Sequence, residues 1–289
     1  MSAPIFFMHR GNEPYLSFSL QQAKCSNPHA EVILIGKPAN RGHGGPHVRH
    51  AFLGDYFAGA ALFSNVYKHD SPNTREYNLF CFQRWFVLRD YMCRHGITEG
   101  YYLDSDVMLY ANMRNSHLRR HPFELCWTTY VHIDPLKQLC EMMMGAFADP
   151  ASFSHLRHHT RQLGHPAVSD MIAFDLFYSH VLGNTRTYGF HQDGLYDYNL
   201  HHCSGFEMQG GFKKIYWSGG ALYGNLLAEH RFLRINSLHF QGGAKIYMSH
   251  FHTPHLPSGR NETFYFHYGA QTWVMSDYAT AAISGDGMP

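Results

Sequence analysis

The sequence predicts an α/β protein with a central, mostly parallel sheet flanked by helices. The chain opens as strand, helix, strand: the apolar burst PIFFM at 4–8, the segment PYLSFSLQQAKCS at 14–26 with proline at its start, and the β-rich EVILI at 31–35. Neither strand alternates polar and apolar residues, which indicates burial on both faces. A βαβ opening of this kind is typical of a parallel sheet with helices on either side.

Later segments continue the alternation of helices and strands. A Gly-, Pro- and His-rich stretch at 37–50 predicts a loop, and 74–95 predicts a long amphipathic helix that stops at Gly96. Further elements are expected as strands at 101–103 and 124–130, helices at 134–147, 150–163 and 168–180, short aromatic strands between glycine turns from 185 to 239, and the start of a helix at 244–251. We expect one domain over 1–275 and a loose tail at 276–289.

Composition and charge exclude several classes of protein. The chain of 289 residues has a formal net charge of +1 with scattered acids and bases, which is not the footprint of a nucleic-acid binder. No window of about 18 residues is apolar enough to span a bilayer, and the apolar run near the N-terminus is too short for a signal peptide. We therefore expect no membrane anchor, no secretion and no nucleic-acid partner.

Cysteine and histidine usage bears on the cellular location of the protein and on whether it stores metal. The 24 histidines are dispersed, so most are interpreted as surface or half-buried polar side chains rather than a metal store. Six dispersed cysteines without a CxxC pair predict reduced, mostly buried thiols and hence a cytoplasmic location; they are Cys25, Cys81, Cys93, Cys126, Cys140 and Cys203.

Two carboxylates stand where a buried strand ends. The apolar stretch 101–103 leads into Asp104-Ser105-Asp106, and residues i and i+2 of extended backbone point to one side. The carboxyl edge of an open α/β sheet is where ligands bind. Neighbouring carboxylates repel unless a cation lies between them, and oxygen ligands suit Mg²⁺ or Mn²⁺. The alternative is that Asp104 and Asp106 cap a helix or complete a turn.

A second motif, HFQGGAK at 239–245, has the spacing H-x-x-G-x-x-K. His239 offers a nitrogen ligand that would favour Mn²⁺, Gly242 lets backbone approach a diphosphate, and Lys245 supplies a charge for a phosphate oxygen. Alone, this stretch is also compatible with a glycine turn beside a core histidine. Together with the Asp-x-Asp, it predicts a metal–diphosphate clamp.

The strand followed by DSD, with a distant HxxGxxK, resembles the GT-A glycosyltransferases, in particular family 8 with glycogenin and bacterial lipopolysaccharide galactosyltransferases. The resemblance implies a Rossmann-like nucleotide-diphospho-sugar transferase fold with a nucleotide-binding half at 1–110 and an acceptor half at 111–275. It also implies a hexosyl- or pentosyltransferase of polysaccharide biosynthesis that uses a UDP-sugar donor, a glycan acceptor and Mn²⁺ or Mg²⁺.

Roles carried over from this resemblance extend to residues outside the two motifs. Arg84, on the helix before the DSD strand, matches a basic residue that touches donor sugar and phosphate, and His9 and Asn12 occupy the loop that lines the base pocket. The chain departs from the family where Lys245 precedes Ile246-Tyr247 instead of Pro-Trp and where the usual Asn-Ala-Gly is missing. These departures leave the donor sugar and the stereochemistry open.

Catalysis would depend on charge at the leaving β-phosphate, which a cation and Lys245 stabilise in the transition state. Asp170 opens a helix where the family carries an acid near the reacting carbon, although an aspartate also favours a helix N-terminus on its own. In an inverting enzyme a carboxylate would act as base, and the candidates, which can equally be ordinary loop acids, are Asp193, Asp197 and Glu207.

Two other classes remain compatible with the sequence: a metal-dependent phosphohydrolase acting on nucleotide or sugar phosphates, and a non-catalytic carbohydrate- or metal-binding module. The transferase interpretation requires Asp104, Asp106 and His239 to converge on one divalent cation, and a phosphohydrolase could use the same three residues. This convergence is the central prediction for the structure.

Overall fold

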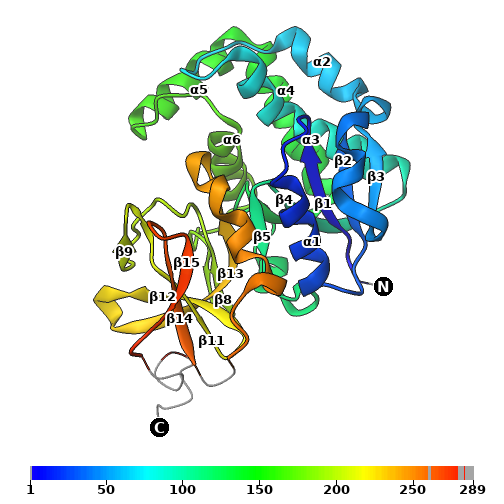
Figure 1. The fold of residues 1–289 in the computed structure, drawn as a ribbon. Helices are drawn as coiled ribbons and strands as arrows, with labels where there is room; N and C mark the ends of the chain where they lie inside the picture. The colour runs from blue at the N-terminus through cyan, green and yellow to red at the C-terminus, as the bar shows by residue number, and fades with distance from the viewer. Residues whose placement is uncertain (1, 260–261, 279–282, 284–289) are drawn as a thin grey trace.

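The computed structural model describes residues 2–259, 262–278 and 283, and contains two sheets (Figure 1). The first has five strands in the order β3-β2-β1-β4-β6, all parallel except β6. Its strands are β1 (Ile5–His9), β2 (Val32–Gly36), β3 (Val48–Phe52), β4 (Glu99–Leu103) and β6 (Thr128–His132). The predicted fold class, a mostly parallel central sheet flanked by helices, is confirmed.

Burial explains the run of apolar residues in the central strands. All five residues of β2 and the first four of β1 are buried, because helices cover the sheet. The helices α2 (Ala58–Val66), α3 (Arg75–Arg94) and α4 (Ile133–Ala148) pack on one another, whereas α1 (Leu16–Ser26) packs against the short strand β5 (Val107–Leu109). The chain adds α5 (Pro150–Gln162), α6 (Asp170–Leu176) and a π-helical turn, Phe177–Val181.

The second sheet is the largest feature that the sequence did not predict as a unit. It has eight strands, with β5 pairing β13 beside the path β15-β14-β11-β12-β13-β8-β7. The strands are β7 (Phe190–His191), β8 (Gly194–Tyr196), β11 (Ile215–Ser218), β12 (Ala221–Leu226), β13 (Arg231–His239), β14 (Thr263–His267) and β15 (Thr272–Met275), and a separate hairpin joins β9 (Met208–Gln209) to β10 (Phe212–Lys213). In Figure 1 this yellow-to-red sheet lies beside the first one, with β5 between them.

Strand β13 brings the two sequence motifs next to each other in space. It pairs antiparallel with β5 so that His239 lies opposite Val107, the residue that follows Asp106. The backbone N–H of Phe240 also donates to the carbonyl of Asp106 at 2.9 Å. The sheet register therefore places the end of β13 against the DSD turn.

Most predicted elements agree with the structure, and several need correction. The loop predicted for 37–50 is wrong in its last three residues, which begin β3, and its first part contains a 3-10 helix, Pro38–His47. The strand predicted at 124–130 begins only at Thr128, and α2 had no prediction. The expected helix at 244–251 lies within a 3-10 helix, Gly242–Phe251. Most of the tail predicted at 276–289 lies outside the described residues.

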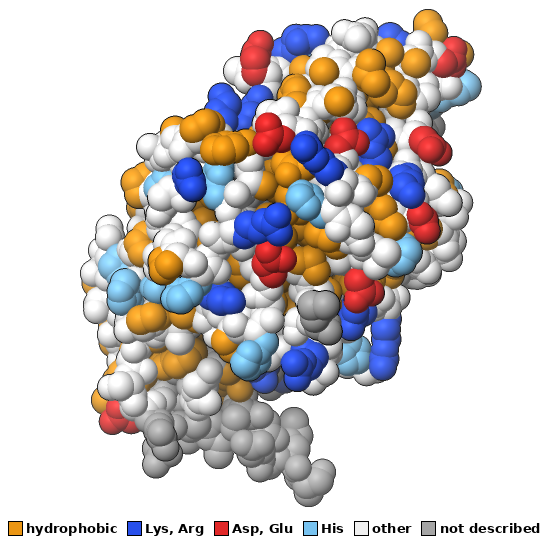
Figure 2. Space-filling view, turned by 90° about the vertical axis from the view of Figure 1, so that its right-hand side faces the viewer, with side chains coloured by type: hydrophobic (Ala, Val, Ile, Leu, Met, Phe, Trp, Pro, Cys, Tyr) orange, Lys and Arg blue, Asp and Glu red, His pale blue; other side chains and the backbone are white. Residues whose placement is uncertain are grey.

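The cysteines and the surface bear on the compositional predictions. All six cysteines are free, but the prediction that they are mostly buried is wrong, since Cys25, Cys93 and Cys203 are exposed. On the face in Figure 2, basic and acidic side chains are intermixed and histidines are scattered. Within 2–259, 262–278 and 283, no helix is both long and apolar enough to cross a membrane. The single domain over 1–275 and its two halves stay predictions.

A buried ion pair secures the segment between β8 and β9. The Lys213 ammonium lies 2.9 Å from an Asp197 carboxylate oxygen, and both side chains are 1% exposed. The other Asp197 oxygen accepts the backbone N–H of His239 at 3.4 Å. Removing one partner of such a pair leaves the other charge buried and uncompensated.

We expect Asp197→Ala to lower the free energy of unfolding by about 3–5 kcal/mol, because Lys213 would lose its counter-charge. Urea denaturation measures the change. Glu229→Ala removes a partner of the exposed Arg231–Glu229 pair and should cost less than about 1 kcal/mol. A loss of unfolding free energy in Asp197→Ala as small as that in Glu229→Ala would contradict the role of the pair. A double variant, Asp197→Leu with Lys213→Met, that is less stable than Asp197→Ala would also contradict it.

Candidate functional site

The DSD turn links β4 to β5 at the carboxyl end of the parallel strands. The Asp104 backbone N–H donates to the Trp127 carbonyl at 2.9 Å, and the Val107 N–H donates back to the Asp104 carbonyl at 3.0 Å. These two bonds hold the turn on both sides. Both carboxylates are partly buried, with side-chain exposures of 19% for Asp104 and 14% for Asp106.

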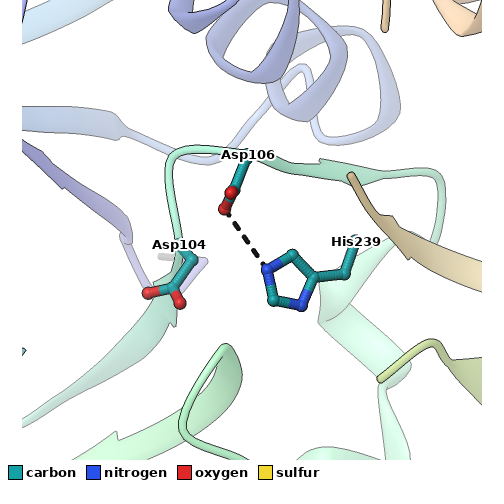
Figure 3. Close-up of side chains that lie close together, drawn as sticks. All are labelled: Asp104, Asp106 and His239. Atoms are coloured by element: carbon teal, nitrogen blue, oxygen red, sulfur yellow. Dashed lines mark ion pairs between the residues drawn. The ribbon is translucent and has the colours of Figure 1, made fainter. Parts of the chain in front are cut away.

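The predicted convergence of Asp104, Asp106 and His239 is present. Each side chain offers one ligand atom, and these atoms lie within 4.8 Å of one another. Figure 3 shows the His239 ring pointing toward the two carboxylates, with its Nε2 atom 3.4 Å from Asp106 Oδ1. The imidazole is brought there by the β13–β5 register across a sequence separation that no local pattern could bridge.

The other ring nitrogen of His239 fixes the tautomer. Nδ1 lies 2.7 Å from the backbone carbonyl of Tyr198, and since a carbonyl can only accept, Nδ1 is the donor. Nε2 therefore faces the carboxylates and, in the neutral ring, has a free lone pair. A backbone acceptor on the far nitrogen is the arrangement that orients histidine ligands in metal sites.

The two carboxyl groups have different electrostatic environments. Burial raises the pKa of Asp104, and the neighbouring Asp106 charge adds to this despite Arg84. Burial also opposes ionisation of Asp106, but His239 and Lys245 outweigh it and hold the pKa of that carboxyl below its usual range. Burial likewise lowers the pKa of His239, yet Asp106 raises it overall. Without a further positive charge, the Asp104 carboxylate is the less favourable of the two to ionise.

The donor set fits a hard divalent cation. Such a cation holds ligands at ~2.1 Å, so opposite ligands lie ~4.2 Å apart, and small side-chain rotations close the 4.8 Å spread. Each carboxylate also has one oxygen bound to a basic side chain: Asp104 Oδ1 accepts from Arg84, and Asp106 Oδ2 lies 2.7 Å from Lys245. Two carboxylates with one imidazole are compatible with Mn²⁺ or Mg²⁺.

A cavity of about 540 Å³ surrounds this cluster. Eight of the nine residues predicted for the site line it: His9, Arg84, Asp104, Asp106, Asp170, His239, Gly242 and Lys245. Gly242 has φ of +61°, a conformation that favours glycine, and a Cβ atom there would meet open space. The structure thus collects residues from β1, α3, α6, the DSD turn and the HxxGxxK segment around one space.

Arg84 links two acids within the cavity. Its guanidinium donates to Asp104 Oδ1 and, through Nε and Nη2, to Asp170 Oδ2 at 3.1 and 2.6 Å. The Trp85 indole N–H donates to the same Asp170 oxygen at 3.0 Å. Burial alone would lower the pKa of Arg84, but Asp104 and Asp170 more than offset it. The guanidinium is therefore a fixed, permanently charged group between the DSD turn and α6.

The base-pocket residues differ in position. His9 lines the cavity, with Nδ1 2.9 Å from the Ser105 hydroxyl and Nε2 2.5 Å from Glu13. Asn12 lies outside the lining, where its side-chain oxygen pairs with His43 at 2.9 Å. The structure does not bring Asn12 into the cavity.

None of the three alternative acids lines the cavity. Asp193 accepts from the His117 backbone and Tyr196, Asp197 is paired with Lys213, and Glu207 accepts from Lys214, Tyr216 and Asn225. Their carboxylates are engaged in the second sheet and its loops. Beyond the DSD pair, Asp170 is the acid in the cavity that binds Arg84.

Several lining residues were missed from the sequence, notably Arg10, Glu13, Tyr15, Trp127 and Tyr198. Arg10, Glu13 and Tyr15 follow β1, and their place after the first strand was a usable signal. Trp127 reaches the site because its carbonyl accepts from Asp104 where β4 pairs with β6, and Tyr198 because its carbonyl accepts from His239. A local sequence pattern reveals neither of these long-range contacts.

Comparison with known proteins gives similarity in structure alone. No family description matches the chain, and no curated protein matches it in sequence. The galactosyltransferase LgtC in complex with donor and acceptor sugar analogues is 14% identical, with 60% of this chain and 69% of that chain covered and a TM-score of 0.32. An active-site mutant of LgtC is 14% identical, with 61% of this chain and 70% of that chain covered and a TM-score of 0.34. Mouse xyloside xylosyltransferase 1 in its apo form is 11% identical, with 62% of this chain and 82% of that chain covered and a TM-score of 0.43.

The proteins in these structures include a galactosyltransferase and a xylosyltransferase. At this level of similarity, function has to be inferred from the chain's own side chains.

We expect Asp106→Asn and His239→Ala to weaken Mn²⁺ binding at least about tenfold, because each alters one of the three candidate ligands. Electron paramagnetic resonance titration of Mn²⁺, with and without UDP, measures the affinity. Asp134→Asn, at an aspartate with 69% side-chain exposure on α4, is the matched control and should bind as the parent does. Unaltered Mn²⁺ affinity in His239→Ala would exclude the imidazole as a ligand.

Proposed function

We propose that this protein is a divalent-metal-dependent glycosyltransferase that transfers a hexose or pentose from a UDP-sugar to a glycan acceptor. The observation that carries the proposal is the convergence of Asp104, Asp106 and His239 beside Lys245 in one cavity at the carboxyl edge of a parallel sheet. Two carboxylates, an imidazole and an ammonium together match the needs of a metal-bound diphosphate.

Each group has a role in the proposed reaction. A divalent cation held by Asp104, Asp106 and His239, Mn²⁺ by preference, would neutralise charge on the departing diphosphate. Lys245, now paired with Asp106 at 2.7 Å, would turn to a phosphate oxygen when Asp106 binds the cation. Open space above Gly242 leaves room for the diphosphate to approach backbone. These groups act where charge develops, so they lower the barrier rather than only bind substrate.

Asp170 and Arg84 are proposed to hold the donor sugar. Asp170 Oδ2 is occupied by Arg84 and Trp85, and among the described residues no hydrogen bond reaches Oδ1. Oδ1 is therefore free to accept from a sugar hydroxyl. Arg84 orients Asp170 through two hydrogen bonds, and its own bond to Asp104 would tie the sugar-binding end to the diphosphate-binding end.

His9, the last residue of β1, is proposed to line the nucleobase site. His9 is held between Ser105 and Glu13, so its ring orientation is fixed in advance. A role in polysaccharide biosynthesis and a cytoplasmic location remain proposals, the latter supported by six free cysteines.

Incubation with UDP-glucose, UDP-galactose and UDP-xylose should give Mn²⁺-dependent UDP release that EDTA abolishes and added Mn²⁺ restores. Lys245→Ala should lower kcat by about 10²–10³, the cost typical of losing one group that stabilises developing charge. Lys137→Ala, at a lysine on the exposed face of α4, is the control. Phosphate release from p-nitrophenyl phosphate without cleavage of any UDP-sugar would instead identify a phosphohydrolase, and no turnover of either would leave a binding module.

We expect Asp170→Asn to lower kcat at least about tenfold, because an amide cannot balance the Arg84 charge or accept equally well from a sugar hydroxyl. Steady-state UDP release measures kcat, and a melting curve recorded in parallel checks folding. Asp175→Asn is the matched control, since Asp175 lies on the same helix and pairs with Arg186 outside the cavity. Asp170→Asn turnover within a few-fold of the parent would remove Asp170 from the catalytic residues.

A further inference from the structure

Arg10 lies on the cavity wall with an unusual set of partners. Its guanidinium carbon lies 3.8 Å from the centroid of the Phe80 ring, and Nη2 donates to the backbone carbonyl of Glu76 at 3.1 Å. Stacking on an aromatic face and a bond to a fixed carbonyl hold the guanidinium plane in place. Its remaining N–H groups lie in that plane, at the edge of the guanidinium.

Within the part of the chain that the structure describes, Arg10 differs from Arg84 and Lys245 in having no acidic partner. Arg84 pairs with Asp104 and Asp170, and Lys245 pairs with Asp106. Among the described residues, no carboxylate lies within ion-pair distance of Arg10; Glu76 contributes its backbone carbonyl. Burial lowers the pKa of Arg10 from its ordinary value, and the Glu76 charge, which lies beyond ion-pair distance, offsets only part of this effect.

The position of Arg10 separates it from the diphosphate end of the cavity. His9, the last residue of β1, contacts Ser105, whereas Arg10, in the bend that follows, packs against Phe80 on α3. On α3, Phe80 and Arg84 are four residues apart and share one face, so Arg10 stacks about one helical turn from the group that holds Asp170. Lys245 lies instead over the Tyr15 ring, 5.5 Å from its centroid.

We propose that Arg10 recognises a carboxylate on the sugar, so that a uronic acid is a substrate of this enzyme, as donor or as acceptor. The inference rests on the proposed transferase function and names a substrate class for it. A uronate differs from the neutral hexose in carrying a carboxylate in place of the primary alcohol at C6. The planar fork of arginine matches that group with two parallel N–H to oxygen bonds, which an alcohol cannot accept.

The preference should be visible in matched substrate pairs. As donors we would compare UDP-glucuronate with UDP-glucose and UDP-galacturonate with UDP-galactose; as acceptors, methyl glucuronide with methyl glucoside. Initial rates of UDP release with Mn²⁺ give kcat/KM for each. We expect the parent protein to favour the uronate at least about tenfold in one arm, the arm showing which substrate carries the carboxylate.

Arg10→Gln should abolish that preference, and Arg10→Lys should retain part of it, because lysine keeps the charge but not the fork. Arg157→Gln, at an exposed arginine that pairs with Asp70 far along the chain, is the control and should keep the parent's ratio. If Arg10→Gln does not fold, as judged by circular dichroism, the Arg10→Lys ratio and the parent's own preference decide the matter.

The outcomes separate this inference from the proposed function. Calorimetric binding of UDP with Mn²⁺ but no uronate preference in either arm would overturn the role of Arg10 alone. An equal loss for uronate and neutral substrates in Arg10→Gln would also overturn it, since Arg10 would then serve a group that both share. No binding of UDP with Mn²⁺ and no turnover of any sugar nucleotide would overturn both.

Discussion

The pairing of β13 with β5 is the constraint on which the candidate site depends. It sets His239 opposite Val107 and bonds Phe240 to the Asp106 carbonyl, so the imidazole reaches the DSD turn through backbone hydrogen bonds rather than through side-chain flexibility. A shift of one residue in this register would turn His239 to the other face of the strand. The geometry of the Asp104, Asp106 and His239 cluster is therefore a property of the sheet as much as of its three side chains.

Charge balance is the second constraint. Four carboxylates line the cavity, and each is held by a basic group: Asp104 and Asp170 by Arg84, Asp106 by Lys245 and His239, and Glu13 by His9. Half-buried charges of this density persist only when paired. Arg84 is shared between two elements, which makes the DSD turn and α6 one electrostatic unit. Under the proposed function, an arriving cation and diphosphate would exchange partners within this unit rather than meet unpaired charges.

Local pattern was enough for part of the fold and of the site. The continuous apolar runs of β1 and β2, the helix at 75–94 and the Asp-x-Asp after β4 are features of short windows, and the sequence predicts them. The second sheet has strands of two to nine residues, and their pairing depends on distant partners, so no short window specifies it. Contacts at the site are likewise invisible to a short window. The carbonyls of Trp127 and Tyr198 accept from Asp104 and His239, and Asp197 meets Lys213 only in the folded chain.

The tripeptide Asp197-Tyr198-Asn199 holds His239 at both ends, by its backbone N–H and by its Nδ1 atom, and Asn199 in turn receives Lys213. Beyond it the chain runs through an exposed, histidine-bearing stretch before β9. Residues 197–199 thus fix the imidazole, whereas residues 201–205, also within the described chain, are mostly exposed and form no hydrogen bond with His239. Insertions or substitutions at 201–205, in evolution or in the laboratory, would change the surface next to the site and leave the His239 ring aligned.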